Sequence, residues 1–142
     1  MLYYAVGKPH RLPKKLLNEV VDFTAKYLKI ENTDCIMEIE FFNKLDACGY
    51  AQEEEYVNYS IQISKEKQYT TKDIIATIMH EMVHVAQYIR GDLVLGKGNK
   101  LSRWKGKPVD LPYSKQPWER QAFRLEKNIW NKFITKNPNA LK

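Results

Sequence analysis

Apolar residues recur at helical spacing in three stretches of the chain, and this pattern predicts three amphipathic helices. The first stretch covers residues 12–30, and the last begins near residue 117 and continues to 134. Pro13 and Pro117 suit the first turns of these two helices, because the N–H group that proline lacks has no partner at that position. Each helix is expected to bury one face.

The middle helix, predicted over residues 71–90, has sequence signals at both ends. Thr70 and Asp73 are spaced as in a capping box, in which each side chain accepts a hydrogen bond from the backbone of the other residue. Gly91 suits the left-handed conformation that commonly ends a helix. We therefore expect a helix that begins and ends at these residues.

Between the first two helices, polar and apolar residues alternate over 35–42, 46–52 and 56–64, which predicts three β-strands. The connecting segments are short, so we expect an antiparallel meander, with Gly49 marking a bulge or a close approach of the backbone. The predicted fold class is α+β, in a single domain over residues 1–142. It has an N-terminal helix, a small, mostly antiparallel three-stranded sheet, and a middle helix packed against the C-terminal helix.

The composition is typical of a globular protein. The 142 residues are 44% hydrophobic and 28% charged, and the uncharged apolar runs are far shorter than the roughly 20 residues needed to cross a bilayer. The N-terminal residues lack the apolar core of a secretory signal. We therefore expect a cytoplasmic monomer without membrane contacts, located in the host cytoplasm if a phage encodes it. Cys35 and Cys48 are expected to be reduced residues of the core or the strands.

Charge is distributed unevenly around a net value of +6. Residues 31–55 carry eight acidic residues and only Lys44 as a basic one, whereas residues 96–116 carry six Lys and Arg and only Asp110 as an acid. The latter range is predicted to be a long connection, and long connections commonly carry function. Its basic segment 97–115 can contact nucleic acid or can form a solvated surface, and the charge pattern agrees with both.

The middle helix contains the sequence HEMVH. Residues four apart lie above each other on one helix face, so His80 and His84 can present both imidazoles to one ion. Glu81 projects about 100° around the helix and can reach a water molecule on that ion without being a ligand. This donor set is typical of a catalytic zinc site. The alternative, polar residues on a purely structural helix, is disfavoured because burying them without a partner is costly.

A third protein ligand is required, and no histidine follows His84. Gln87 and Arg90 stand where the metzincin pattern has Gly and His or Asp, so a carboxylate must complete the set. Glu119 is favoured because it lies in the first turn of the C-terminal helix. If this helix packs antiparallel to the middle helix, that turn directs Glu119 toward the histidines. Glu126 remains open as the ligand or as an outer partner, and Glu119 can also simply compensate the helix N-terminus. Of the other downstream acids, Asp92 lies just past the end of the middle helix and is expected to point away from the histidines, and Asp110 lies in a loop.

With HEMVH at 80–84 and PWERQA at 117–122, the chain resembles the gluzincin class of zinc metallopeptidases in its minimal single-domain form, including small phage-encoded and bacterial SprT-like proteins. The resemblance covers residues 71–126. It implies a substrate held extended on the edge strand of the sheet. True SprT and Spartan proteases use a third histidine, which this chain lacks. The resemblance also implies one zinc ion per chain, with Glu81 as the general base and acid. The implied ligands are His80, His84 and Glu119.

Further candidate residues surround this motif. The strand segment Gly49, Tyr50 and Ala51 is expected to bind substrate through backbone hydrogen bonds. Tyr113 and Arg103 lie in the long connection, and they are candidates for donating to the developing oxyanion and for contacting substrate. Alternatively, both side chains only pack against the loop or keep it in contact with solvent. The leading hypothesis is a zinc metalloendopeptidase that acts on a peptide or protein. The alternative is a basic nucleic-acid-associated protein with a mainly structural zinc site.

Overall fold

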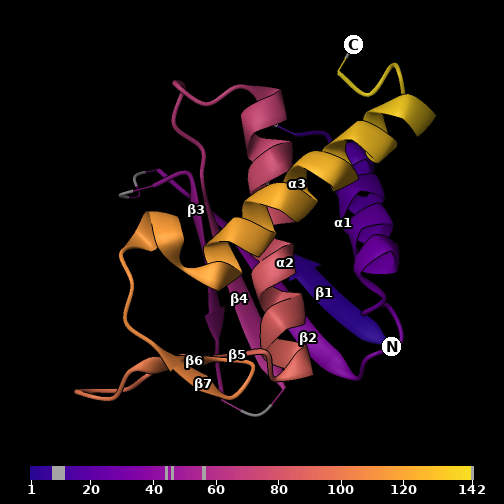
Figure 1. The fold of residues 1–142 in the computed structure, drawn as a ribbon. Coiled ribbons are helices and arrows are strands. Elements are labelled where there is room, and N and C mark those ends of the chain that lie inside the picture. Colours follow the sequence, from indigo (N-terminus) through magenta and orange to yellow (C-terminus); the bar gives the residue numbers. More distant parts are fainter. Residues whose placement is uncertain (8–11, 44, 46, 56, 142) are drawn as a thin grey trace.

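The computed structural model describes residues 1–7, 12–43, 45, 47–55 and 57–141 (Figure 1). Its helices and strands confirm the α+β class, and the three long helices agree with the predicted ones to within a few residues. In chain order, the elements are β1 (Leu2–Val6), α1 (Lys14–Leu28), β2 (Cys35–Phe42), β3 (Gly49–Glu53), β4 (Asn58–Ser64), α2 (Thr71–Arg90), β5 (Leu93–Val94), β6 (Ser102–Trp104), β7 (Lys107–Val109), the 3₁₀ turn η1 (Tyr113–Lys115) and α3 (Pro117–Lys136).

The main sheet is mixed and has the strand order β1-β2-β4-β3. β1, β2 and β4 run parallel, and β3 pairs antiparallel with β4, with Ala51 opposite Ile61. The predicted antiparallel meander is therefore wrong for this part of the chain. The three predicted strands do alternate in direction, but β4 lies between β2 and β3. β1, which pairs with β2, is an additional strand that was not predicted from sequence.

Burial explains this strand order. β4 points Tyr59, Ile61 and Ile63 toward the helices, and both isoleucines are fully buried. An apolar side chain is removed from water most completely on a central strand, because neighbouring strands cover it on both sides. β4 is therefore central, and β3 forms the edge. β3 offers only small or charged residues on the same face: Gly49, Ala51 and Glu53.

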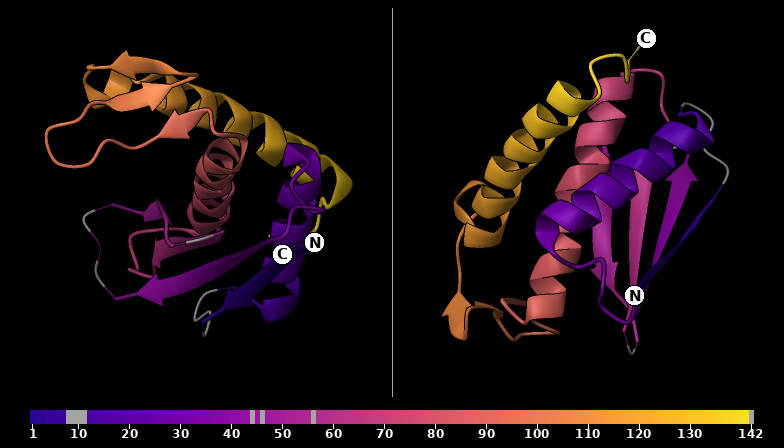
Figure 2. Two further views of the ribbon diagram at one scale, coloured as in Figure 1. Left: turned by 90° about the horizontal axis from the view of Figure 1, so that it is seen from below. Right: turned by 90° about the vertical axis from the view of Figure 1, so that its right-hand side faces the viewer.

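The three helices lie on one side of the main sheet in two layers (Figure 2). α2 contacts β3 and β4 with α1 beside it, and α3 packs on the outer side of α1 and α2. α2 is thus enclosed, and its buried residues are continuous from Ile78 to Tyr88. Its ends match the prediction: Thr70 Oγ1 accepts from the Asp73 N–H at 3.1 Å in a capping box, and Gly91 has a left-handed φ of 73°.

The predicted long connection 96–116 contains regular structure. A small antiparallel sheet has the order β5-β6-β7, and we call its residues 93–109 the basic wing (Figure 1). β6 and β7 form a hairpin in which Lys105 and Gly106 both have positive φ, 50° and 83°, as a tight hairpin turn requires. A three-stranded antiparallel sheet is therefore present, but it is formed by the wing and not by residues 35–64.

Composition led to one expectation about the cysteines and one about membrane-spanning helices. Cys35 and Cys48 are both free thiols, as predicted. None of the described helices combines the length and the apolar character that crossing a membrane demands.

Candidate metal centre

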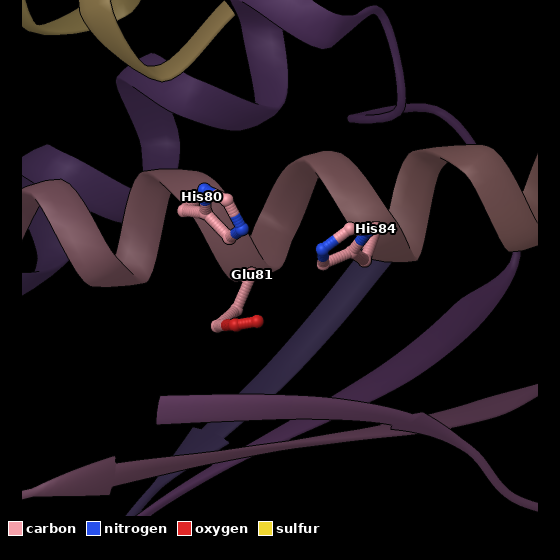
Figure 3. A group of neighbouring side chains, drawn as sticks. All are labelled: His80, Glu81 and His84. Atoms are coloured by element: carbon pink, nitrogen blue, oxygen red, sulfur yellow. The ribbon is translucent and has the colours of Figure 1, made fainter. Parts of the chain in front are cut away.

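The HEMVH segment lies in the middle of α2, where the helix is enclosed between the sheet and α3. His80, Glu81 and His84 are buried, with exposed fractions of 8%, 5% and 6%. Figure 3 shows the two imidazoles following one another along the helix and Glu81 pointing toward the strands. One ligand atom of each residue lies within 4.8 Å of the others, so this group can hold a metal ion.

α3 brings a carboxylate to the imidazole pair. Glu119 lies in the first turn of α3, directly after Trp118, a buried residue that anchors the start of this helix. Oε1 of Glu119 is 3.0 Å from Nε2 of His80, and Oε2 is 3.1 Å from Nε2 of His84. One buried carboxylate therefore spans both rings, using one oxygen for each.

The outer nitrogens of both imidazoles are also hydrogen-bonded. Nδ1 of His80 is 2.9 Å from Oε1 of Glu126, and Nδ1 of His84 is 2.8 Å from Oε1 of Gln87. Glu126 thus lies behind His80, on the side away from Glu119. The contact between Gln87 and His84 is not among the features predicted from sequence, where Gln87 serves only to exclude a metzincin. The available signal was its position three residues after His84, a spacing at which helical side chains are neighbours.

Every nitrogen of the two imidazoles faces an acceptor oxygen, which determines the electrostatics of the centre. Burial disfavours protonation of His80, but the hydrogen bonds to Glu119 and Glu126 outweigh burial and raise the pKa of His80 to about 9. Burial likewise favours the neutral form of Glu119, yet the hydrogen bonds to His80 and His84 lower the pKa of Glu119 to about 2. Both shifts follow from the same arrangement, in which positive charge beside the Glu119 carboxylate is stabilised.

That charge can come from protons on the imidazoles or from a metal ion. Two ligands of a tetrahedral zinc ion, each bonded at about 2.0–2.1 Å, lie about 3.3 Å apart. The oxygens of Glu119 lie at 3.0 and 3.1 Å from the Nε2 atoms, close to this separation. Imidazole nitrogen and carboxylate oxygen are also donors that zinc prefers. The donor types of His80, His84 and Glu119, and the two separations between the Glu119 carboxylate and the imidazoles, therefore suit a metal ion such as zinc.

A cavity of about 610 Å³ opens beside the centre, and its walls come from β3, α2, β5, η1 and α3. Glu81 lines this cavity, and burial raises the pKa of its carboxyl group although His84 and His80 act in the opposite direction. Phe123 also lines it, with its ring centroid 4.6 Å from that of His80. Phe123 is not among the residues predicted from sequence, although its position one helical turn after Glu119 indicated that it would lie near the centre.

β3 forms one wall of this cavity, which Gly49, Tyr50 and Ala51 line. The predicted close approach at Gly49 is confirmed: a Cβ there would lie 2.6 Å from Cγ2 of Thr77 on α2 and 2.9 Å from the backbone oxygen of Gln62. Within the described part of the chain, β3 pairs only with β4. Its second edge is therefore free to form backbone hydrogen bonds.

The two candidates in the long connection differ in their distance from the centre. Tyr113 lines the cavity, and its hydroxyl donates to Oε1 of Glu119 at 3.1 Å. Burial and the adjacent carboxylate raise the pKa of Tyr113 to about 12. Arg103 is not among the residues that line the cavity, and its guanidinium donates to the carbonyl of Gly106 in the same hairpin. The structure thus brings Tyr113, but not Arg103, to the centre.

The centre is assembled from a His-x-x-x-His pair on α2 and a carboxylate on α3, with Glu81 beside them. These residue types are the ones that the resemblance to gluzincins implies. No known protein family, curated protein or solved structure matches the chain, so its function is inferred from this geometry.

Proposed function

We propose that the protein is a zinc-dependent metalloendopeptidase that hydrolyses peptide bonds with a metal-activated water. The observation that carries this proposal is the Glu119 carboxylate within 3.0 and 3.1 Å of the Nε2 atoms of His80 and His84. These three residues would hold the ion. When bound, zinc polarises the substrate carbonyl and lowers the pKa of a bound water to near neutrality.

Glu81 is suited to move the proton in this reaction. Burial raises the pKa of its carboxyl group above the ordinary value, which makes the carboxylate a stronger base for accepting a proton from water and later donating it to the leaving amine. The side chain leaves α2 on the side of the strands, toward the cavity (Figure 3). The proposed base therefore lies between the metal ligands and the wall that β3 forms.

The cavity supports binding of an extended peptide. The free edge of β3 can pair with a substrate backbone, a mode of binding that needs little sequence preference. The hydroxyl of Tyr113 lies beside the proposed metal ligand Glu119, where it can donate to the oxygen that becomes negatively charged. Substrate strand, proton carrier and oxyanion donor thus surround one cavity.

The test combines metal analysis with hydrolysis of an unstructured protein. The wild type is expected to bind one zinc ion per chain and to release fragments. Glu81→Gln is expected to retain the zinc ion and to lose about 10²–10⁴-fold in rate. Glu19→Gln, the same change on an exposed part of α1, is the matched control and is expected to keep the wild-type rate. Equal rates in the wild type and Glu81→Gln would contradict the mechanism, and a zinc-free wild type would contradict the whole proposal.

A second candidate function, binding of nucleic acid, is favoured by the exposed charge. The solvent-facing side of α3 carries Arg120, Arg124 and Lys127 at helical spacing. These residues and the cations of the wing form no ion pair with a described acidic residue. Unpaired cations on adjacent surfaces suit contacts with phosphate groups. The exposed cations of the wing are Lys97, Lys100, Arg103, Lys105 and Lys107.

Titration with duplex DNA at several salt concentrations tests this second function. Phosphate contacts predict an affinity that falls steeply with salt, and the combined change Arg120→Glu and Arg124→Glu is expected to weaken binding. Lys26→Glu, on the exposed side of α1, is the control. Binding that neither salt nor the α3 changes weaken would contradict the proposal.

A further inference from the structure

Gln87 is a buried polar residue that the proposed mechanism does not use. It lies on α2 three residues after His84 and has an exposed fraction of 0%. Its Nε2 donates to the backbone oxygen of Trp118 at 3.0 Å and to Oε1 of Gln121 at 2.9 Å, both on α3. Its Oε1 is 2.8 Å from Nδ1 of His84. One side chain therefore joins a proposed metal ligand on α2 to the start of α3.

These partners determine which way the amide of Gln87 faces. A backbone carbonyl only accepts hydrogen bonds, so the NH₂ group must face Trp118 and the amide oxygen must face His84. An amide oxygen also only accepts, so Nδ1 of His84 carries the hydrogen. In the neutral ring, the lone pair is then left on Nε2, the atom 3.1 Å from Oε2 of Glu119.

The same side chain holds the backbone next to the proposed third ligand. Trp118 directly precedes Glu119 in the first turn of α3. A displacement of the Trp118 carbonyl therefore moves Glu119 relative to His84. The hydrogen bond from Gln87 to this carbonyl opposes such a displacement, because the donor lies in the part of α2 that is packed on all sides.

We propose that Gln87 is a positioning residue that couples the packing of α3 to metal binding. It selects the tautomer of His84 whose lone pair lies on Nε2, the nitrogen that would bind the ion, and it holds the backbone that carries Glu119. This inference rests on the proposed zinc site. Loss of a hydrogen-bond partner behind a metal ligand typically lowers metal affinity about 10–100-fold, and the same range is expected here.

The first test measures zinc affinity by competition with a chromogenic chelator. Gln87→Leu removes all three hydrogen bonds of this side chain at similar volume and is expected to bind zinc about 10–100-fold more weakly than the wild type. Gln121→Ala is the matched control, because it leaves the contacts of Gln87 with His84 and Trp118 in place, and it is expected to retain wild-type affinity. Gln87→Glu keeps an acceptor for Nδ1 of His84 but cannot donate to Trp118. If Gln87→Leu does not fold, this second variant is used instead, and it is expected to lose affinity because the backbone next to Glu119 is no longer held.

A second readout does not depend on the metal. The Nδ1–H of His84 is expected to give an exchange-protected imidazole signal in ¹H–¹⁵N spectra of the wild type and to lose that protection in Gln87→Leu. Wild-type zinc affinity together with a protected signal in Gln87→Leu would overturn the inference. A wild type that binds no zinc would overturn the proposed function, and the protection of His84 would still decide whether Gln87 positions this ring.

Discussion

Replacing Gly49 with alanine places a methyl group between β3 and α2, at the wall of the proposed substrate cavity. The added Cβ would lie 2.6 Å from Cγ2 of Thr77, 2.9 Å from the backbone oxygen of Gln62 and 3.1 Å from Cδ1 of Ile63. The first two distances are shorter than any normal contact of a Cβ atom. β3 must therefore move away from α2, or α2 must shift.

The expected cost follows from these contacts. The Gln62 oxygen belongs to the β3–β4 pairing and cannot move alone, so the added methyl group acts as overpacking of a well-packed region. Overpacking of this size costs about 1–3 kcal/mol in the free energy of unfolding. In a chain of 142 residues, each kcal/mol lowers Tm by about 4 °C, so Gly49→Ala is expected to lower Tm by about 4–12 °C.

Urea unfolding and thermal melting of the metal-free protein measure this cost without the proposed zinc site. Gly7→Ala is the matched control, because a Cβ at Gly7 meets its nearest atom, the Ile39 oxygen, at an ordinary 3.7 Å. Thr77→Ser removes Cγ2 and keeps the hydroxyl, so adding it to Gly49→Ala is expected to recover part of the loss. If Gly49→Ala were no less stable than Gly7→Ala, the close seating of β3 on α2 would be refuted.

Three further predictions concern the centre and the helix that carries it. Glu119→Ala is expected to bind less zinc than the wild type because it lacks a proposed ligand, whereas Asp110→Ala, in an exposed loop, should match the wild type in metal analysis; equal zinc in both variants would contradict the ligand assignment. In the metal-free protein, the pKa of His80 is raised from 6.5 to about 9, so its contribution to stability is complete below about pH 6.5 and is lost as pH rises through about 9. The pKa of Glu119 is lowered from 4.5 to about 2, so its contribution is present above about pH 4.5 and is lost as pH falls through about 2. Thermal melts of chelator-treated protein should therefore show this contribution in full between about pH 4.5 and 6.5, and a profile that Glu119→Ala leaves unchanged would refute the pairing. Thr70→Ala removes the acceptor for the Asp73 N–H and is expected to cost about 1 kcal/mol in urea unfolding, whereas an unchanged midpoint would contradict the capping box.

The sequence by itself determined the features that depend on residues close together in the chain. Apolar spacing located α1, α2 and α3, and Thr70, Asp73 and Gly91 marked the ends of α2, because the face and the ends of a helix are set by side chains within a few positions. The same local rule placed His80 and His84 on one face of α2. Alternation likewise identified β2, β3 and β4, and the short connections between them indicated their alternating directions.

Only the tertiary structure decided the neighbours of each strand. Alternation shows which side chains share a face but not which strand lies next to which. It therefore could not predict that β4 lies between β2 and β3. β1 is short and pairs in parallel with a strand that follows an entire helix, a contact that loop length does not predict. Competition for burial in the finished core selects this order.

The geometry of the centre was also a tertiary result. Sequence elimination favoured Glu119 over Glu126 but did not measure where either carboxylate lies, because the position of α3 against α2 depends on packing along the whole helix pair. The contact between Gln87 and His84 spans three residues, yet the orientation of its amide is set by Trp118 from the other helix. Side chains from separate elements acquire defined distances only when the core that holds those elements is complete.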